Sequence, residues 1–141
     1  MDWLTTSPYL LSKNQLTRTV DSLESLEFQV VRVDAGELGP DLEESVLIVL
    51  SKALSFSPLG AGHWGAFSDR LWDVLTGENK QPLAILLEDF DQVLRTDFHA
   101  FVRIVHMLLS LTEDLGLKME SPTARQIEYF FVGTWPTRVT S

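Results

Sequence analysis

One short segment limits the fold of this chain more than any other. Every residue from Leu83 to Leu87 is apolar, in the order L-A-I-L-L. A strand that is buried on one face alternates apolar and polar residues, whereas a central parallel strand is covered on both faces and is apolar throughout. Pro82 precedes the segment, at a strand start where its missing N–H is tolerated. The segment therefore predicts the central strand of a parallel sheet with helices around it.

Two other segments, residues 28–33 and 127–132, are short and rich in β-branched and aromatic residues, as strands are. Residues 9–11 are a candidate for one more short strand. Apolar residues recur near helical spacing in four segments: 12–25, 41–56, 68–76 and 97–114. Because strands alternate with helices, we expect an α/β fold in which a small parallel sheet is flanked by helices.

Polar residues and glycines mark the expected helix ends. Asp41 is placed as an N-cap, with two glutamates in the first turn where the helix dipole favours acidic side chains. Gly77 is expected to end the helix over 68–76 in a left-handed conformation. The remaining predicted caps and ends are Ser12, Ser68, Asp89 or Asp91, Thr96 or Asp97, and Gly116.

Composition bounds the class of protein. The chain has 141 residues, 45% of them hydrophobic, which suits a single domain with its own core. There is no cysteine, so a reducing compartment is favoured and thiolate chemistry is excluded. The N-terminus lacks the basic and apolar regions of a secretory signal, and no apolar run approaches the roughly 20 residues of a membrane helix. We therefore expect a cytoplasmic protein.

The net charge of −9 restricts the partners. Binding of nucleic acid requires clustered Lys and Arg to contact the phosphates, so direct binding is disfavoured, as is docking on anionic membranes. Long-range attraction favours rapid encounter with a basic protein instead. The alternative is that the acidity only keeps the protein in solution.

The stretch Gly62–Gly77 is the strongest candidate for a functional site. Asp69 and Asp73 are four residues apart, on one face of a predicted helix, and Trp72 lies beside them. Like charges at this spacing slightly oppose helix formation, which suggests that the helix presents acid and an aromatic ring to a partner. Packing against the core is an equal alternative for both Trp64 and Trp72. Arg70 can pair with Asp73 at i,i+3.

The same stretch resembles the barstar family, the intracellular inhibitors of a secreted ribonuclease. In that family an aromatic–Gly pair opens a loop, the next helix carries D-x-L-W-D, Thr-Gly closes it, and a Pro-led apolar strand follows. The matching residues here are Trp64-Gly65, Asp69–Asp73, Thr76-Gly77 and Pro82–Leu87. The close match covers about residues 64–87, and the order of elements continues it to the C-terminus.

This resemblance implies a three-stranded parallel sheet flanked by helices over residues 27–135, with residues 1–26 as an N-terminal βα addition to the single domain of residues 1–141. It also implies inhibition of a basic, barnase-like ribonuclease by an acidic helix and the loop before it. Asp73 would enter the active site of the enzyme, with Asp69 in a supporting ion pair. The other contact residues would be Trp72, Thr76, Gly77, His63, Trp64 and Gly65.

The chain departs from the family pattern at four positions. Phe67 replaces a usual Asn, Glu78 an aromatic residue and His63 a second aromatic, while Arg70 adds a positive charge between the aspartates. These changes favour an alternative function, a barstar-like module that binds a protein other than a ribonuclease.

Enzymatic chemistry finds little support in the sequence. It has no dinucleotide or phosphate-binding glycine loop, no G-x-S-x-G elbow and no HExxH zinc motif. His99 and His106 have no third ligand at a recognisable spacing. Glu88, Asp89 and Asp91 are an alternative acid or metal site, although the start of a helical segment explains them more simply. We expect no catalytic residue, metal or cofactor.

Overall fold

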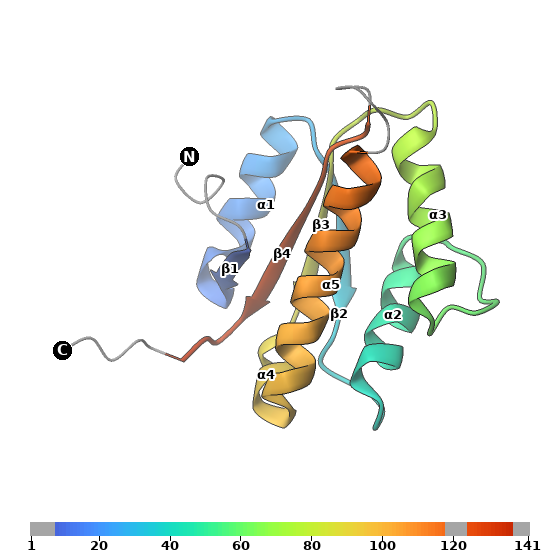
Figure 1. Ribbon diagram of the computed structural model, residues 1–141. Coiled ribbons are helices and arrows are strands. Elements are labelled where there is room, and N and C mark those ends of the chain that lie inside the picture. The colour runs from blue at the N-terminus through green and yellow to red at the C-terminus, as the bar shows by residue number, and fades with distance from the viewer. Residues whose placement is uncertain (1–7, 118–123, 137–141) are drawn as a thin grey trace.

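The computed structural model describes residues 8–117 and 124–136 of the chain (Figure 1). Its centre is a sheet of four strands in the order β1-β4-β3-β2, and all neighbouring strands are parallel. The strands are β1 (Tyr9–Ser12), β2 (Gln29–Asp34), β3 (Leu83–Glu88) and β4 (Ile127–Gly133). The predicted α/β fold with a parallel sheet flanked by helices is confirmed.

The predicted number of strands is wrong, because β1 joins the same sheet as the other three. Tyr9 pairs with Phe130 and Ser12 with Gly133, so β1 extends the sheet beyond β4. Leu11 is buried in the pairing, whereas Leu10 points away and is 47% exposed. The N-terminal βα unit is therefore built into the sheet, where the resemblance implied three strands and an addition.

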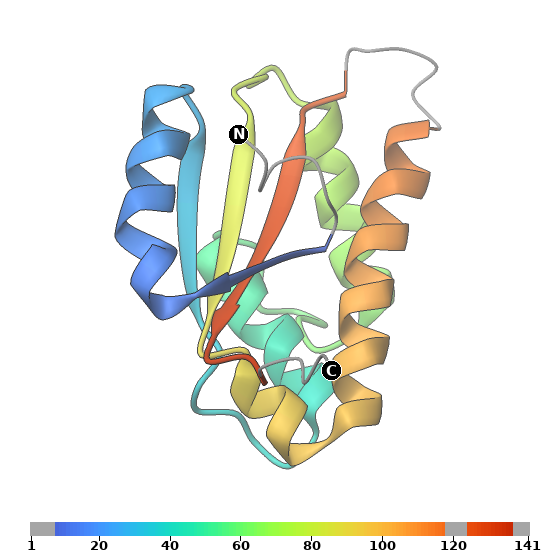
Figure 2. The same ribbon diagram turned by 90° about the vertical axis from the view of Figure 1, so that its left-hand side faces the viewer.

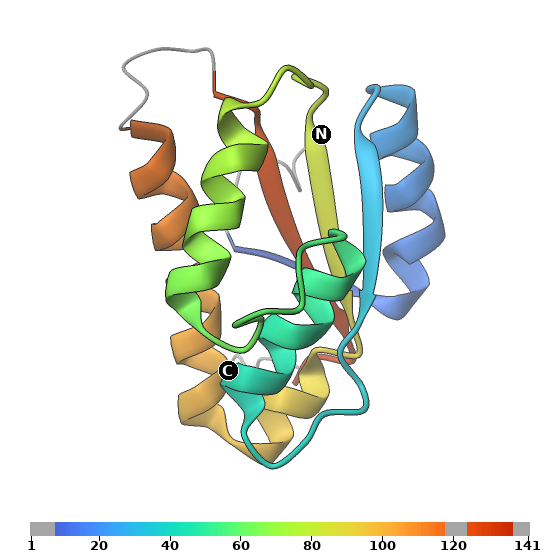
Figure 3. The same cartoon turned by 90° about the vertical axis from the view of Figure 1, so that its right-hand side faces the viewer.

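Helices cover both faces of the sheet (Figures 2 and 3). On one face lies α1 (Leu16–Ser25), which continues a short 3-10 turn over Lys13–Gln15. The other face is covered by the remaining helices, which are α2 (Leu42–Ala53), α3 (Trp64–Thr76), α4 (Asp91–Thr96) and α5 (Phe98–Leu117). Within the described residues, no helix has both the length and the apolar character needed to cross a bilayer.

The strand β3 divides two hydrophobic cores, as its sequence predicts. Leu83, Ile85 and Leu87 point into the larger core, under α2, α3 and α5. Ala84 and Leu86 point into the smaller core, under α1. This alternation with period two places every residue from 83 to 87 out of contact with water.

The helix ends agree only in part with the local signals. Asp41 caps α2, since its Oδ1 accepts from the Glu44 amide at 3.1 Å. Asp97 likewise accepts from the Ala100 amide, at 3.2 Å, in the first turn of α5. Gly116 was predicted to end that helix, which is wrong because α5 runs on to Leu117. Neither Asp89 nor Asp91 caps α4, whose N-cap is Phe90.

Candidate protein-binding surface

The helix α3 begins four residues earlier than the sequence predicts. Its N-cap is His63, not Ser68, and the Phe67 amide donates to the His63 carbonyl at 3.1 Å to form the first turn. Phe67 is fully buried, and the ring of Trp64 meets it edge-on, with centroids 6.2 Å apart. Packing of these two rings therefore favours a helix that begins before Ser68, the predicted cap.

The far end of α3 lies at Gly77, as predicted, but the glycine is extended (φ −67°, ψ 177°) and not left-handed. Other groups satisfy the last carbonyls, which lack partners within the helix. Lys80 Nζ and the Arg125 amide both donate to the Leu75 carbonyl, at 3.1 and 3.2 Å. The glycine still has a steric role, because a Cβ there would lie 3.0 Å from the Asp73 carbonyl oxygen.

The two faces of α3 are sharply different. Phe67, Leu71 and Leu75 are buried in the larger core. On the opposite side Gly65, Asp69, Asp73 and Thr76 are exposed, since successive residues turn by about 100° and residues four apart share a face. We call the residues Gly65, Asp69, Trp72, Asp73 and Thr76 the α3 surface.

Trp72 stands at the edge of this surface, toward α5. The side chain is half-buried and packs against the core, and it lines an open hollow of about 520 Å³ with Ser68, Asp69, Asp73 and Leu115. Packing against the core is therefore confirmed for part of the Trp72 side chain, and the side chain also lines the hollow beside the two aspartates.

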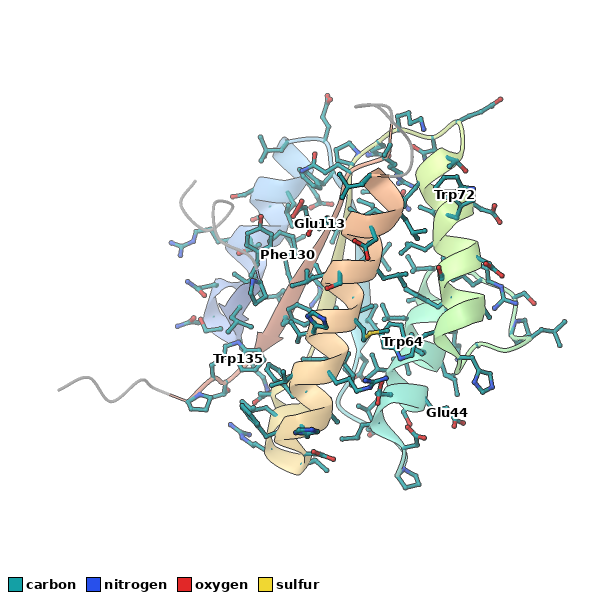
Figure 4. All side chains as sticks on the ribbon, in the orientation of Figure 1. Glu44, Trp64, Trp72, Glu113, Phe130 and Trp135 are labelled. Carbon is teal, nitrogen blue, oxygen red and sulfur yellow. The ribbon has the colours of Figure 1, made fainter. Side chains whose placement is uncertain are left out.

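Trp64 lies at the other end of α3, as Figure 4 shows, and is held in place from two sides. Its Nε1 donates to Glu43 Oε1 at 3.1 Å, and the same oxygen accepts from Arg103 Nε at 2.8 Å. Glu43 thus joins α2, α3 and α5. The predicted contact residues His63 and Gly65 are exposed beside Trp64. A 13-residue helix is about 20 Å long, so these residues and Asp73 form one extended surface and not a single pocket.

The charge of Arg70 is directed away from the aspartates. Its Nη2 donates to the Leu59 carbonyl at 2.5 Å, and its Nη1 is buried without a hydrogen-bond partner. The predicted pairing with Asp73 is therefore wrong. Within residues 8–117 and 124–136, no Lys, Arg or His nitrogen lies within 4.0 Å of the carboxylate of Asp69 or Asp73. The α3 surface keeps both negative charges uncompensated at close range.

The carboxylates at the end of β3 are all engaged in the fold. Glu88 accepts from Arg32 at 2.6 Å, and Asp89 pairs with Lys13 at 2.9 Å. Asp91 is 1% exposed, and its Oδ2 accepts from the Thr134 amide at 3.0 Å. These interactions join the carboxyl ends of the four strands. The acidic cluster therefore has a structural role, but through ion pairs and a loop amide and not through the predicted capping of a helix.

The histidines add no ligand cluster. His99 and His106 are both exposed on α5, and His106 Nδ1 lies 3.5 Å from Ser110 Oγ. Over the part of the chain that the structure describes, no group of three or more His, Asp or Glu side chains is arranged to hold a metal ion.

Four residues of this region carry no local sequence signal. Glu43 reaches Trp64 of α3 from α2, and Arg103 of α5 contacts Glu43. Leu115 completes the hollow, and Leu59 supplies a carbonyl from the preceding loop. The contact between Glu43 and Arg103 joins residues 60 positions apart, which no helical spacing indicates.

The chain was compared with protein-family models, with curated proteins and with solved structures, and none of them matches. The resemblance to the barstar family therefore rests on residues 64–87 and on the order of the elements.

Proposed function

We propose that this protein is an inhibitor of a basic, barnase-like ribonuclease, and that it acts in the cytoplasm by covering the active site of the enzyme with the α3 surface. The observation that carries the proposal is the pair Asp69 and Asp73, exposed on a rigid helix beside Trp72 with no cation of the described chain in contact. The protein would act by binding and not by catalysis.

Electrostatics supports this proposal. A ribonuclease binds the phosphates of its substrate with clustered basic side chains, and a carboxylate on a helix can take the place of a phosphate oxygen. Charge-assisted hydrogen bonds of this kind are shorter and stronger than neutral ones. The net charge of −9 would also attract a basic enzyme over a long range and speed the encounter.

Packing supports it as well. The acidic pair is held by a helix whose other face is buried in the core, so little conformational freedom would be lost on binding. The half-buried ring of Trp72 lies next to both carboxylates and would exclude water from their contacts with the enzyme.

The test is a titration of a purified barnase-like ribonuclease with the purified protein, in which cleavage of RNA is followed. We expect stoichiometric inhibition that weakens as salt is raised. Asp73→Asn keeps the shape of the side chain and removes its charge, and it should weaken inhibition by at least about thirtyfold, the lower end of the cost of breaking a buried charge pair.

The matched control is Asp21→Asn. This aspartate is exposed on α1, on the opposite face of the sheet, and the substitution changes the net charge equally. Inhibition by this variant should match that of the unchanged protein. The proposal fails if the unchanged protein does not inhibit, or if the two substitutions have the same effect.

A second candidate function is that of an interaction module whose partner is not a ribonuclease. Two observations favour it. Phe67, at a position where the family usually has Asn, is fully buried and cannot reach a partner, and Glu78, where the family has an aromatic residue, is exposed. Such a module would leave RNA cleavage unchanged at any ratio of the two proteins.

A further inference from the structure

The loop that joins α2 to α3 displays an unusually exposed apolar side chain. Leu59 is 78% exposed, more than any other large apolar residue that the structure describes. In Figure 1 this loop extends beyond α3 on the side away from α5, and Figure 3 shows it beside the first turns of α3. Single exposed apolar residues are common on proteins, so the argument depends on how this one is held.

The backbone of the loop is fixed by its own hydrogen bonds. These are donated by the amides of Leu59, Ala61 and His63 to Ser57 Oγ (3.3 Å), the Pro58 carbonyl (3.2 Å) and the Gly60 carbonyl (3.0 Å). Gly60 has a φ of +68°, which favours glycine, and a Cβ there would lie 3.2 Å from Ala66 Cβ on α3. The loop is thus a closed turn that packs against the helix.

Arg70 ties this turn to α3. Its Nη2 donates to the carbonyl of Leu59 itself, and the guanidinium is partly buried between the loop and the helix. Leu59 therefore exposes its side chain while its backbone carbonyl is held by Arg70. Because the position of Leu59 is already set, its burial by a partner would cost little ordering of the chain.

Helical geometry sets the position of the loop relative to the acidic pair. At about 100° per residue, Asp73 lies roughly 40° around α3 from Asp69, Ala66 about 60° and Arg70 about 100°, all in the same direction. Trp72 lies about 60° in the other direction. The acidic pair thus has Trp72 on one side and the loop that carries Leu59 on the other.

We infer that Leu59, on the loop beside the α3 surface, is a specificity-determining residue, and that the partner has an apolar pocket at the rim of its basic cleft. Arg70 is a positioning residue, which holds Leu59 for that pocket. This inference rests on the proposed function. It adds a requirement on the partner, namely an apolar rim around the basic cleft. An enzyme with an equally basic cleft but a polar rim would be bound less well.

The experiment measures binding of the barnase-like ribonuclease to the unchanged protein and to variants by surface plasmon resonance. Burial of one leucine is worth about ten- to a hundredfold in affinity. We expect Leu59→Ser to weaken binding by at least tenfold, mainly through faster dissociation. The control Leu117→Ser removes a side chain that is 72% exposed near the hollow lined by Tyr9 and Tyr129, and should change binding by less than twofold.

The test of Arg70 must separate the positioning of Leu59 from a general contribution to stability. Arg70→Gln should weaken binding several-fold and speed amide hydrogen exchange at Ala61 and His63, with an unchanged melting temperature. Arg70→Lys, which can still donate to the Leu59 carbonyl, should restore part of both properties.

Each outcome bears on a separate claim. Failure of the unchanged protein to bind overturns the proposed function and this inference together. Binding that is lost in Asp73→Asn but kept within twofold in Leu59→Ser overturns the inference alone. Binding and exchange that are both unchanged in Arg70→Gln overturn the positioning role of Arg70.

Discussion

The protein has two groups of carboxylates, and they differ in what surrounds them. At the carboxyl end of the sheet, Glu88 and Asp89 each contact a cation, and Asp91 is buried against a backbone amide. On α3, Asp69 and Asp73 are exposed with no cation of the described chain within reach. Carboxylates of the first group hold strands and loops together, whereas those of the second group make no ion pair with the described residues. Substitutions that separate stability from binding test this difference.

The largest effect on stability is expected for Asp91→Ala. Asp91 Oδ2 accepts from the Thr134 amide and lies 3.3 Å from Arg95 Nη1, so its loss leaves a partly buried donor unsatisfied. We expect the free energy of unfolding to fall by up to about 3 kcal/mol, measured by urea unfolding. Asp73→Ala should change it by less than about 0.5 kcal/mol. Equal losses in the two variants would contradict the distinction between the groups.

Tyr129 extends the comparison to a buried group that titrates. Burial raises its pKa to about 12, and its hydroxyl lies 2.8 Å from Thr112 Oγ1. The pKa of tyrosine in the unfolded chain is about 10. The protonated Tyr129 hydroxyl therefore contributes fully to the free energy of unfolding below pH 10, and this contribution is lost as the pH rises toward 12. The loss should be about 2–3 kcal/mol, measured by urea unfolding at several pH values. In Tyr129→Phe the decrease in stability between about pH 10 and pH 12 should be absent. If the decrease persists, ionisation of Tyr129 is not its cause.

A smaller effect is expected for Glu43, a carboxylate of the fold that contacts the first turn of α3. Glu43→Ala removes the acceptor shared by Trp64 and Arg103, and should cost about 1 kcal/mol of unfolding free energy. It should also shift the indole N–H signal of Trp64 in the NMR spectrum. The matched control is Glu44→Ala, an exposed neighbour on the same helix, which should leave that signal in place.

The smallest effect is expected for Lys13→Met. The ion pair with Asp89 is short at 2.9 Å, but the two side chains are 58% and 41% exposed. Water and salt screen exposed pairs, and holding two long side chains together costs entropy. The urea midpoint should not change measurably at either low or high salt. A clear drop of the urea midpoint that persists in high salt would show that this ion pair stabilises the fold, as the contacts of Asp91 do.

The sequence predicts the fold best where burial alone decides the structure. Leu83–Leu87 is apolar on both faces, and it forms the central strand with one face in each core. The sequence does not indicate which strands pair with each other. Residues 9–11 look like a short strand, but nothing in them indicates that they pair with β4 at the other end of the chain. The three strands that the resemblance implies therefore leave this strand outside the sheet.

Local signals fail where tertiary packing competes with them. Ser68 is a good N-cap by type, yet the rings of Trp64 and Phe67 pack so that α3 starts earlier. At the site, spacing alone gave the shared exposed face of Asp69 and Asp73. The contact of Arg70 with Leu59 depends on the path of a loop, and i,i+3 spacing suggested Asp73 instead.

The position of β1 at the sheet edge bears on the synthesis of the protein. The ribosome makes β1 first and its partner β4 last, and Trp135 Nε1 donates to the Leu11 carbonyl across 124 residues. At roughly 5–20 residues per second, β1 waits about 6–24 s for β4 to be made. Leu11 and Leu23 have no complete core to enter during that time, because Phe130 and Val132 complete it. A chain that stops short of β4 would keep these leucines in contact with water, which makes it a substrate for chaperones and proteases.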